Sequence, residues 1–415
     1  GASQLYGWRT NGTPILPGSP SSGLLATPGG RFGLLSGKIA VGEFNGDDTL
    51  DLTVAGSKSG PLPPASADTR DLYGWTLRAS GGDHLIDTLF TGRLPHSITT
   101  SPVVSDSFVA YGTKQGMVYL LRHDGSVAES LRVNSPDTSD IVSLSLYQNP
   151  GSFLAVTSNG SLGLIGLVCA DNSALLTPDE MKIHPAFAIA ATLSAERGKN
   201  VILVSRDGQV SIRAICPLIA HGSLTVRTGG EILNAPAVAD LDGDGIKDVV
   251  VCSGNRIYAI NAIGSVLDNF PVTVPSSKTI LTSPVIADID GDGSPDVAVV
   301  TREGLVVAYD KTGKMIRGFP LLAGSNGGST PAVFYMPGDC LSCTDIGLAV
   351  ASDDGHVYAW RTGTLRTGLL PPPVQPWPQY LHDARNTGYS DTVLPLHPGS
   401  SEFFPVSRAY NWPNP

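Results

Sequence analysis

Short apolar stretches separated by tight-turn residues recur along the whole chain. In residues 234–271, the stretch "PAVA" is followed by an acidic loop, then "DVVV", a short glycine turn and "RIYAI". Stretches rich in Val, Ile and Tyr and bounded by Gly, Pro or Asp are typical of β-strands. Because "DVVV" and its equivalents are apolar throughout, we expect these inner strands to be buried on both faces. The pattern predicts an all-β protein in which helices are rare.

The same order of elements repeats. Residues 282–320 can be laid over residues 234–271, so that Asp288 is equivalent to Asp240, 48 residues earlier. Weaker copies cover the ranges 39–90, 100–133, 141–169, 186–216 and 329–370. A period of this length indicates a solenoid or a propeller, and we find no capping repeats that an open array would need. We therefore predict a seven-bladed β-propeller of four-stranded blades over residues 39–374.

The N-terminal residues predict an additional piece. Residues 5–20 read as a third and a fourth strand with no first and second strand before them. Residues 1–38 are therefore expected to complete or close the propeller, for example by pairing with C-terminal strands, and a chain cut from a longer one is the alternative. A count of eight blades stays open on this evidence.

Composition narrows the classes of function. The chain has 415 residues with 37 acidic and 27 basic side chains and a formal net charge of −10. It has no basic stripe, so a nucleic-acid partner is not expected. No apolar run reaches the roughly 18 residues of a transmembrane helix, and the N-terminus lacks signal-peptide features. We expect a soluble chain that is mature or truncated, of undetermined oligomeric state.

Two loops repeat the pattern DxDGDGxxD, with aspartates at positions 1, 3, 5 and 9. The aspartates are Asp240, Asp242, Asp244 and Asp248 in the first loop, and Asp288, Asp290, Asp292 and Asp296 in the second. Ile246 and Ser294, at position 7 of the two loops, can each contribute a backbone carbonyl oxygen as a further metal ligand. Several carboxylates and a carbonyl converging from one tight loop form the oxygen ligand set of calcium. Gly243 and Gly245 permit the left-handed backbone that such a loop needs.

The same loops have two alternative interpretations. An EF-hand would need a glutamate at position 12 and flanking helices, whereas the flanks here are strands. A solvated Asp-Gly turn without metal is the second alternative. We predict two calcium sites, each closing the hairpin between the first two strands of a blade.

A third loop keeps the same register with different residues. The expected ligands are Glu43, Asn45, Asp47, the carbonyl of Thr49, and Asp51. Asp48 replaces a glycine, so this turn adopts the left-handed backbone less easily. The third calcium site is therefore the weaker prediction.

The last repeat lacks the motif. Tyr335 replaces the first aspartate, and a lengthened loop carries Cys340 and Cys343. We hypothesise that a disulfide staples this hairpin, with plain thiols as the alternative. A zinc site would need a second pair of ligands nearby, and none is present.

Catalytic signatures are missing from the sequence. It contains no GxSxG, HExxH or GxxxxGK[ST] pattern, and the eight histidines are scattered. Aromatic pairs recur at one repeat position, in Tyr6 and Trp8, Tyr73 and Trp75, and Tyr358 and Trp360. We interpret them as packing between blades, with a carbohydrate-stacking surface as the alternative. The irregular insertion at residues 57–71 is either a binding loop opposite the acidic loops or a disordered surface loop.

The motifs carry a family resemblance. The repeated "ADxDGDGxxDVxV", followed by "GxVYAW" and "GFP", resembles the FG-GAP or VCBS-type repeats of integrin-α-like β-propellers from residue 39 to about residue 370. The resemblance implies a seven-bladed propeller with calcium in the hairpins of one face and ligand binding by loops on the other.

The C-terminal region resembles two further segments. Residues 376–390, "PWPQYLHDARNTGYS", are similar to the segment that closes such bacterial propellers. Residues 402–415 are similar to the "YNYPNP" region that precedes the sorting domain of proteins exported by the type nine secretion route of Bacteroidetes and Chlorobi relatives. The resemblance implies that residues 375–415 are a closing segment and a linker toward a sorting domain, in a secreted or cell-surface protein.

These observations favour a non-enzymatic role. We expect a calcium-stabilised extracellular interaction propeller, an adhesion or scaffold module, that binds a protein or glycan partner. A polysaccharide lyase is the enzyme alternative, and it would need Lys, Arg, His or Tyr side chains gathered around the central channel. A lectin would show aromatic and polar side chains gathered in matching pockets.

Overall fold

The computed structural model describes most of the repeat region and parts of the flanks. The described residues are 5–7, 24–26, 39–44, 47, 49–55, 72–80, 83–92, 94–133, 139–148, 150–166, 175–194, 198–214, 224–324, 327–338, 343–366 and 376–390. Among them, the helical elements are the single turn α1 (Pro178–Met181) and the 3-10 turn η1 (Lys114–Gly116). No helix in these ranges is long and apolar enough to cross a membrane. The all-β prediction is confirmed.

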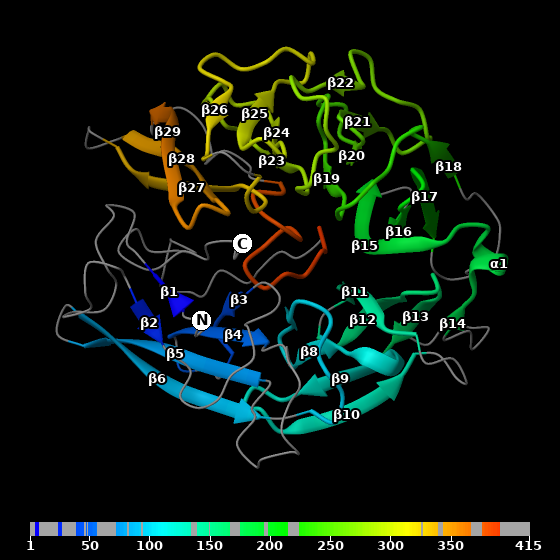
Figure 1. The fold of residues 1–415 in the computed structure, drawn as a ribbon, viewed down its shortest axis with the longest axis vertical. Helices are drawn as coiled ribbons and strands as arrows, with labels where there is room; N and C mark the ends of the chain where they lie inside the picture. The colour runs from blue at the N-terminus through cyan, green and yellow to red at the C-terminus, as the bar shows by residue number, and fades with distance from the viewer. Residues whose placement is uncertain are drawn as a thin grey trace.

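The strands after residue 39 form seven antiparallel sheets arranged in a ring (Figure 1). We number these sheets as blades 1 to 7 in chain order. Blade 1 contains β3 (Ala40–Gly42), β4 (Leu50–Ala55), β5 (Leu72–Ser80) and β6 (Asp83–Gly92). Blade 2 contains β7 (Val103–Val104), β8 (Val109–Gly112), β9 (Met117–Leu121) and β10 (Val127–Arg132). Blade 3 contains β11 (Ile141–Gln148), β12 (Ser152–Thr157), β13 (Leu162–Ile165) and β14 (Leu175–Leu176).

The remaining blades follow the same order. Blade 4 contains β15 (Pro185–Ser194), β16 (Gly198–Ser205), β17 (Gln209–Ala214) and β18 (Leu224–Arg227). Blade 5 contains β19 (Ala237–Ala239), β20 (Asp248–Ser253), β21 (Arg256–Ile260) and β22 (Val272–Thr273). Blade 6 contains β23 (Val285–Ala287), β24 (Asp296–Val300), β25 (Leu305–Tyr309) and β26 (Leu321–Leu322). Blade 7 contains β27 (Ala332–Pro337), β28 (Cys343–Ala351) and β29 (Val357–Arg366).

The chain is thus a seven-bladed β-propeller, as predicted. Six blades have four strands, and blade 7 has three strands within the described residues. Residues 367–375 lie outside the described ranges. The N-terminal strands β1 (Leu5–Tyr6) and β2 (Leu24–Ala26) pair with each other, and Figure 1 places them between blade 7 and blade 1. The role of residues 1–38 in closing the ring stays a prediction.

The aligned repeats fold in the same register. Ala239 lies opposite Asp248 in blade 5, and Ala287 lies opposite Asp296 in blade 6. Every residue of the second strands β20 and β24 is buried. The predicted burial of the inner strands is therefore confirmed, and it leaves the acidic loops between first and second strands at one rim of each blade.

The segment of residues 376–390, here called the central segment, lies in the middle of the ring (Figure 1). The innermost strand of a blade has no neighbouring strand on its channel side, so its backbone N–H groups there need acceptors. Six inner strands donate one such N–H each to the central segment, at 2.6 to 3.2 Å. These bonds run from Ile286 to Trp377, Val333 to Pro378, Val41 to Ala384, Val104 to Arg385, Leu146 to Thr387, and Ala190 to Gly388.

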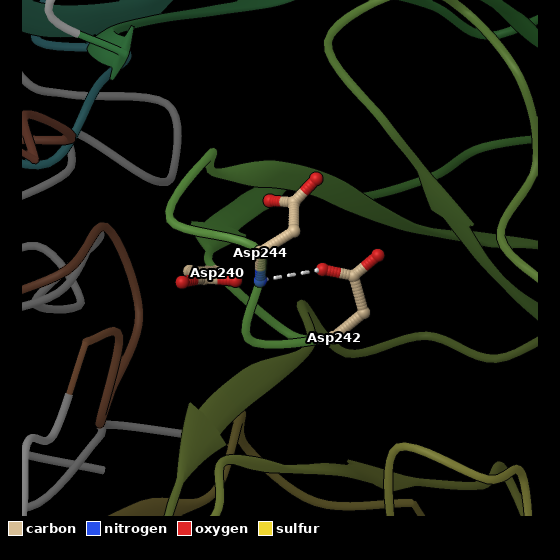
Figure 2. A group of neighbouring side chains, drawn as sticks. All are labelled: Asp240, Asp242 and Asp244. Atoms are coloured by element: carbon tan, nitrogen blue, oxygen red, sulfur yellow. Dashed lines mark hydrogen bonds between the residues drawn. The ribbon is translucent and has the colours of Figure 1, made fainter.

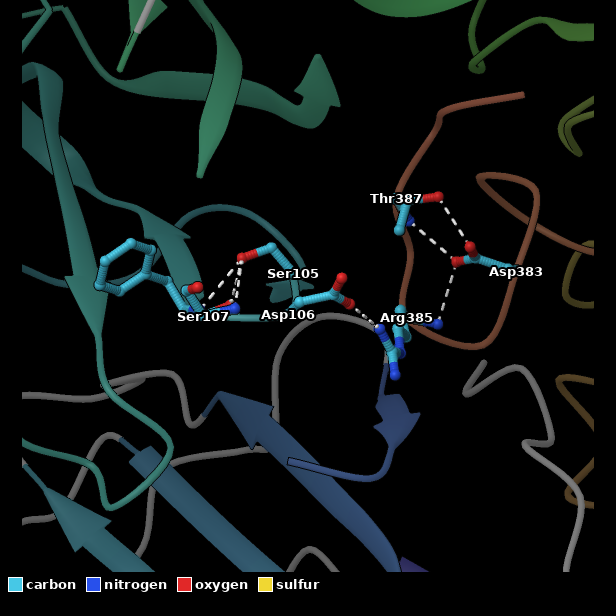
Figure 3. Close-up of polar contacts among 7 residues, drawn as sticks. Ser105, Asp106, Ser107, Asp383, Arg385 and Thr387 are labelled. Atoms are coloured by element: carbon cyan, nitrogen blue, oxygen red, sulfur yellow. Dashed lines mark hydrogen bonds and ion pairs between the residues drawn. The ribbon is translucent and has the colours of Figure 1, made fainter. Parts of the chain in front are cut away.

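Side chains fix the central segment in this path. The Asp383 carboxylate accepts bonds from the backbone N–H groups of Arg385 and Thr387 and from the Thr387 hydroxyl (Figure 3). The Arg385 guanidinium donates to Asp106 of blade 2 at 2.8 Å (Figure 3). Lys247 of blade 5 donates its Nζ to Ser390 Oγ at 2.7 Å. The central segment therefore contacts all seven blades.

Asn386 joins the first two blades directly. Its buried side-chain amide donates to the carbonyls of Ile39 and Pro102, both at 3.1 Å. We predict that Asn386→Ala lowers the free energy of unfolding by about 1 to 3 kcal/mol, because two buried carbonyls lose their donor. Urea unfolding measures this change.

Asn255→Ala is the matched control for this variant. The Asn255 amide donates to Ser276 within blade 5 and joins no separate blades. A loss for Asn386→Ala no larger than that for Asn255→Ala would contradict the bridging role of Asn386.

Candidate metal centre

The two acidic loops are built by hydrogen bonds from their own backbone. In the 240–248 loop, the bonds run from Gly243 N and Gly245 N to Asp240, Asp244 N to Asp242, Ile246 N to Asp244, and Leu241 N to Asp248, at 2.7 to 3.1 Å. Figure 2 shows Asp240, Asp242 and Asp244 of this loop and the hydrogen bond that the Asp244 N–H donates to the Asp242 carboxylate. Gly243 and Gly245 have φ angles of 83° and 82°, which confirms that both use the left-handed region.

The 288–296 loop repeats this geometry. Its bonds run from Gly291 N and Gly293 N to Asp288, Asp292 N to Asp290, Ser294 N to Asp292, and Ile289 N to Asp296, at 2.7 to 3.1 Å. In each loop the first aspartate accepts backbone N–H groups on both carboxylate oxygens, whereas the aspartates at positions 3, 5 and 9 each accept one N–H on a single oxygen. The second oxygens of these three aspartates are the groups most available to a cation.

The loops bring acidic groups together in two triplets. Carboxylate oxygens of Asp240, Asp242 and Asp244 lie within 4.8 Å of one another, and so do those of Asp288, Asp290 and Asp296. Asp248 and Asp292 belong to the same loops but lie outside these triplets. Ile246 and Ser294 occupy their predicted positions, and the use of their carbonyls as ligands stays a prediction.

Burial makes the charged form of the position-9 aspartates unfavourable. Burial, with smaller contributions from the neighbouring carboxylates, raises the pKa of Asp296 to about 8 and that of Asp248 to about 7. Burial also raises the pKa of Asp288 and of Asp290. A cation among these carboxylates would oppose the effect by neutralising the cluster.

The residues present fit a calcium-type ion. Asp296 is 1% exposed, and its Oδ1 is buried with no hydrogen-bond partner among the described residues. A buried carboxylate oxygen without a partner costs free energy unless a cation or proton meets it. The surrounding donors are all oxygens from several carboxylates, which suits a hard divalent cation and not zinc.

The third predicted loop is only partly described. Asp51 lies opposite Gly42, in the register that Asp248 has opposite Ala239, and its carboxylate accepts the Phe44 N–H at 2.8 Å. Asp47 accepts the Thr49 N–H at 2.9 Å, and the Glu43 carboxylate accepts the Asp47 N–H at 3.2 Å. Burial raises the Asp51 pKa to about 6. Asn45 lies outside the described residues, and the described part of this loop forms no third acidic triplet.

In blade 7 the hairpin is held by other means. Cys343 is disulfide-bonded, and Cys340, its predicted partner, lies outside the described residues. The buried Asp345 forms an ion pair with Arg361 Nε at 2.8 Å and accepts the Thr364 hydroxyl at 2.6 Å. Sequence reasoning missed this pair because the lengthened hairpin shifts Asp345 out of the repeat register.

The aromatic pairs pack as expected where they are described. Tyr73 and Trp75 are stacked with ring centroids 5.5 Å apart and belong to the core of blade 1. Tyr358 and Trp360 are stacked at 6.0 Å and pack against the core between blades 6 and 7. The Tyr6 side chain, Trp8 and residues 57–71 lie outside what the structure describes.

Comparison with known proteins agrees with this architecture. The FG-GAP-like repeat family matches residues 240–299, a range that contains both complete acidic loops. The matched residues are similar to FG-GAP-like repeats. A sequence comparison with curated proteins finds no significant match.

Solved structures show the same fold at low sequence identity. The crystal structure of Chaetomium thermophilum Sqt1 bound to the N-terminus of the ribosomal protein L10 is 12% identical, with a TM-score of 0.56 over 81% of this chain and 86% of that one. BBS1N in complex with ARL6DN is 13% identical, with a TM-score of 0.50 over 80% of this chain and 93% of that one. At this identity the similarity establishes the fold alone.

The raised pKa values predict an unusual pH dependence for protein stripped of divalent cations. The folded carboxyls of Asp248 and Asp296 keep their protons up to about pH 7 and 8, whereas the unfolded ones release them near 3.8. The folded state thus binds more protons in this window, so stability is highest at the acidic end and falls as pH rises. For the two groups together we expect a loss on the order of 6 kcal/mol between pH 5 and 8.

Thermal melts of stripped protein at several pH values, each repeated with calcium, measure this dependence. Asp248→Asn/Asp296→Asn is the matched variant, because it cannot titrate at either position and should flatten the profile. A stripped protein that becomes more stable from pH 5 to 8 would contradict the prediction.

Proposed function

We propose that this protein is a calcium-stabilised extracellular interaction propeller that binds a protein partner. The observation that carries the calcium part is the 288–296 loop, where carboxylates converge beside the buried, unpaired oxygen of Asp296. Asp288, Asp290, Asp292, the Ser294 carbonyl and Asp296 would hold the ion. The 240–248 loop would hold a second ion with the equivalent residues, and the 43–51 loop is a weaker third candidate.

Calcium in these loops would act on stability. The ion neutralises like charges that the hairpin otherwise holds close together, and it binds only where the loop is folded. Binding to the native state alone adds folding free energy by mass action. The ion therefore needs no catalytic role.

The interaction role is supported by the rigidity of the ring. The seven blades present their connecting loops from a scaffold that the central segment fixes, an arrangement that favours recognition by loops. Both similar structures are complexes, of Sqt1 with the N-terminus of the ribosomal protein L10 and of BBS1N with ARL6DN. By analogy we infer a protein partner here, with a glycan as the alternative ligand.

An extracellular location is supported by the disulfide. Disulfides such as that of Cys343 persist in oxidising compartments and are rare in reducing ones. The similarity of residues 402–415 to a type nine secretion region points the same way, and these residues lie outside the described part of the chain.

The lyase alternative is less well supported. The basic and aromatic side chains on and next to the central segment are engaged with other side chains of the protein. Arg385 pairs with Asp106, and the Lys199 ammonium lies over the rings of Tyr147 and Tyr389 at 4.9 and 4.7 Å. Such engagement suits packing better than proton transfer to a substrate.

Calcium dependence is the first test. We expect millimolar calcium to raise the melting temperature of stripped protein by several degrees, since saturation at about 100 times Kd adds about 2.7 kcal/mol. Asp242→Asn/Asp290→Asn should abolish most of this rise. Asp268→Asn, which removes an exposed aspartate from a turn of blade 5 outside the loops, is the control and should leave the rise unchanged.

A glycan array tests the ligand class. With folded, calcium-loaded protein we expect no sugar to bind, because the described Tyr73 and Trp75 are buried in the core of blade 1. Calcium-dependent binding to a defined sugar would favour the lectin or lyase interpretation over a protein partner.

A further inference from the structure

The two complete acidic loops share a sequence pattern and differ in their surroundings. Asp288 is 2% exposed, whereas Asp240 is only partly buried. A Cβ added at Gly291 would lie 3.3 Å from the Thr364 carbonyl oxygen, whereas one added at the equivalent Gly243 would meet nothing within 4 Å. The 288–296 loop is therefore covered where the 240–248 loop is open.

The cover is the end of strand β29 from the adjacent blade. Thr362 Oγ1 donates to the Ile289 carbonyl at 2.7 Å. A Cβ added at Gly363 would lie 2.6 Å from the carbonyl carbon and oxygen of Asp290, so the two backbones are in direct contact. The Arg361 and Thr364 side chains hold this end of β29 onto Asp345 of β28.

The cover is possible because blade 7 has a long hairpin. Strands β28 and β29 have 9 and 10 residues, whereas the equivalent β24 and β25 of blade 6 have 5 each. The additional residues extend past the rim of blade 7 and reach the loop of blade 6. At the 240–248 loop the neighbouring strand β15 of blade 4 contacts only the C-terminal end, where its Leu193 carbonyl accepts the Lys247 N–H at 2.8 Å. The stretch from Asp242 to Gly245 stays exposed.

The acidic triplets differ accordingly. In the 288–296 loop the triplet includes the buried Asp296, whose Oδ1 has no partner among the described residues. In the 240–248 loop it consists of Asp240, Asp242 and Asp244, of which the last two are exposed, and Asp248 lies apart. The candidate ligands of the covered loop are therefore more buried than those of the open loop.

Cover changes the electrostatic balance of binding. Charges shielded from water interact more strongly, both among the carboxylates and between a carboxylate and a cation. Around the open loop, water and salt weaken the same attraction. A loop already fixed by contacts also loses less conformational freedom when it binds an ion.

We propose that the two loops are unequal calcium sites, with the 288–296 loop binding more tightly and releasing calcium more slowly because the end of β29 covers it. This inference rests on the proposed calcium function. The 240–248 loop is the weaker site and exchanges its ion freely. Blade 7, which lacks the acidic motif itself, determines the affinity of its neighbour.

Calcium titration of the full stripped chain by isothermal calorimetry tests the ranking. We expect two phases whose dissociation constants differ at least tenfold. Asp290→Asn and Asp242→Asn change the same position of each loop and form a matched pair. The first should remove the tighter phase and the second the weaker one, and stopped-flow chelation should show slower calcium release from the Asp242→Asn variant.

Two substitutions test the cover itself. Gly363→Val should push β29 away from Asp290 and weaken the tighter phase at least tenfold, with the weaker phase unchanged. Thr362→Val removes only the bond to Ile289 and should weaken the tighter phase several-fold in a chain that keeps its fold. Val357→Thr, at the exposed opposite end of β29, is the control and should change neither phase.

The outcomes separate this inference from the proposed function. Three outcomes would overturn the ranking while leaving calcium binding in place. The first is a single phase in which both sites have the same affinity, and the second is loss of the weaker phase in Asp290→Asn. The third is a tighter phase that stays unchanged in both Gly363→Val and Thr362→Val. No heat of binding and no gain in melting temperature with calcium would instead overturn the calcium proposal itself.

Discussion

The ring depends on the hydrogen bonds that its innermost strands donate to the central segment. Each described blade is built from strands that are consecutive in the chain, so none of the seven blades by itself joins the beginning of the repeat region to its end. Residues 376–390 make that connection, because they bond β23 and β27 near the end and β3 and β7 near the beginning. These bonds also satisfy N–H groups that would otherwise be buried without acceptors.

Once the ring is closed, the hairpins at its rim must accommodate negative charge. Three of them carry acidic loops, in which a cation would balance the aspartates. Two others carry a single aspartate that an arginine balances, Arg385 for Asp106 and Arg361 for Asp345. The guanidinium does for one carboxylate what a divalent ion would do for several. Positive charge at these hairpins thus comes from an arginine in two blades and would come from a cation in the others.

The sequence predicted what depends on local pattern. The period between Asp240 and Asp288 predicted the register of blades 5 and 6, and the glycine positions predicted the left-handed turns of both loops. The path of the central segment from blade to blade could not be derived from residue patterns, since each bond joins residues far apart in the chain. The same holds for the contact of Gly363 with Asp290, which requires the exact length of a hairpin in another blade.

The covered loop and the central segment meet on one strand. Ile286 of β23 exchanges two backbone hydrogen bonds with Trp377, and Asp288, the first aspartate of the covered loop, follows two residues later. Val333 of the next blade bonds to Pro378, and that blade also supplies the β29 cover. An ion in the 288–296 loop would thus stabilise the junction of blades 6 and 7, where the central segment enters the ring. An ion in the 240–248 loop would act instead between blades 4 and 5, because Lys247 donates its backbone N–H to Leu193 of β15 and its Nζ to Ser390. Two loops that share one motif would thus stabilise different points of the ring.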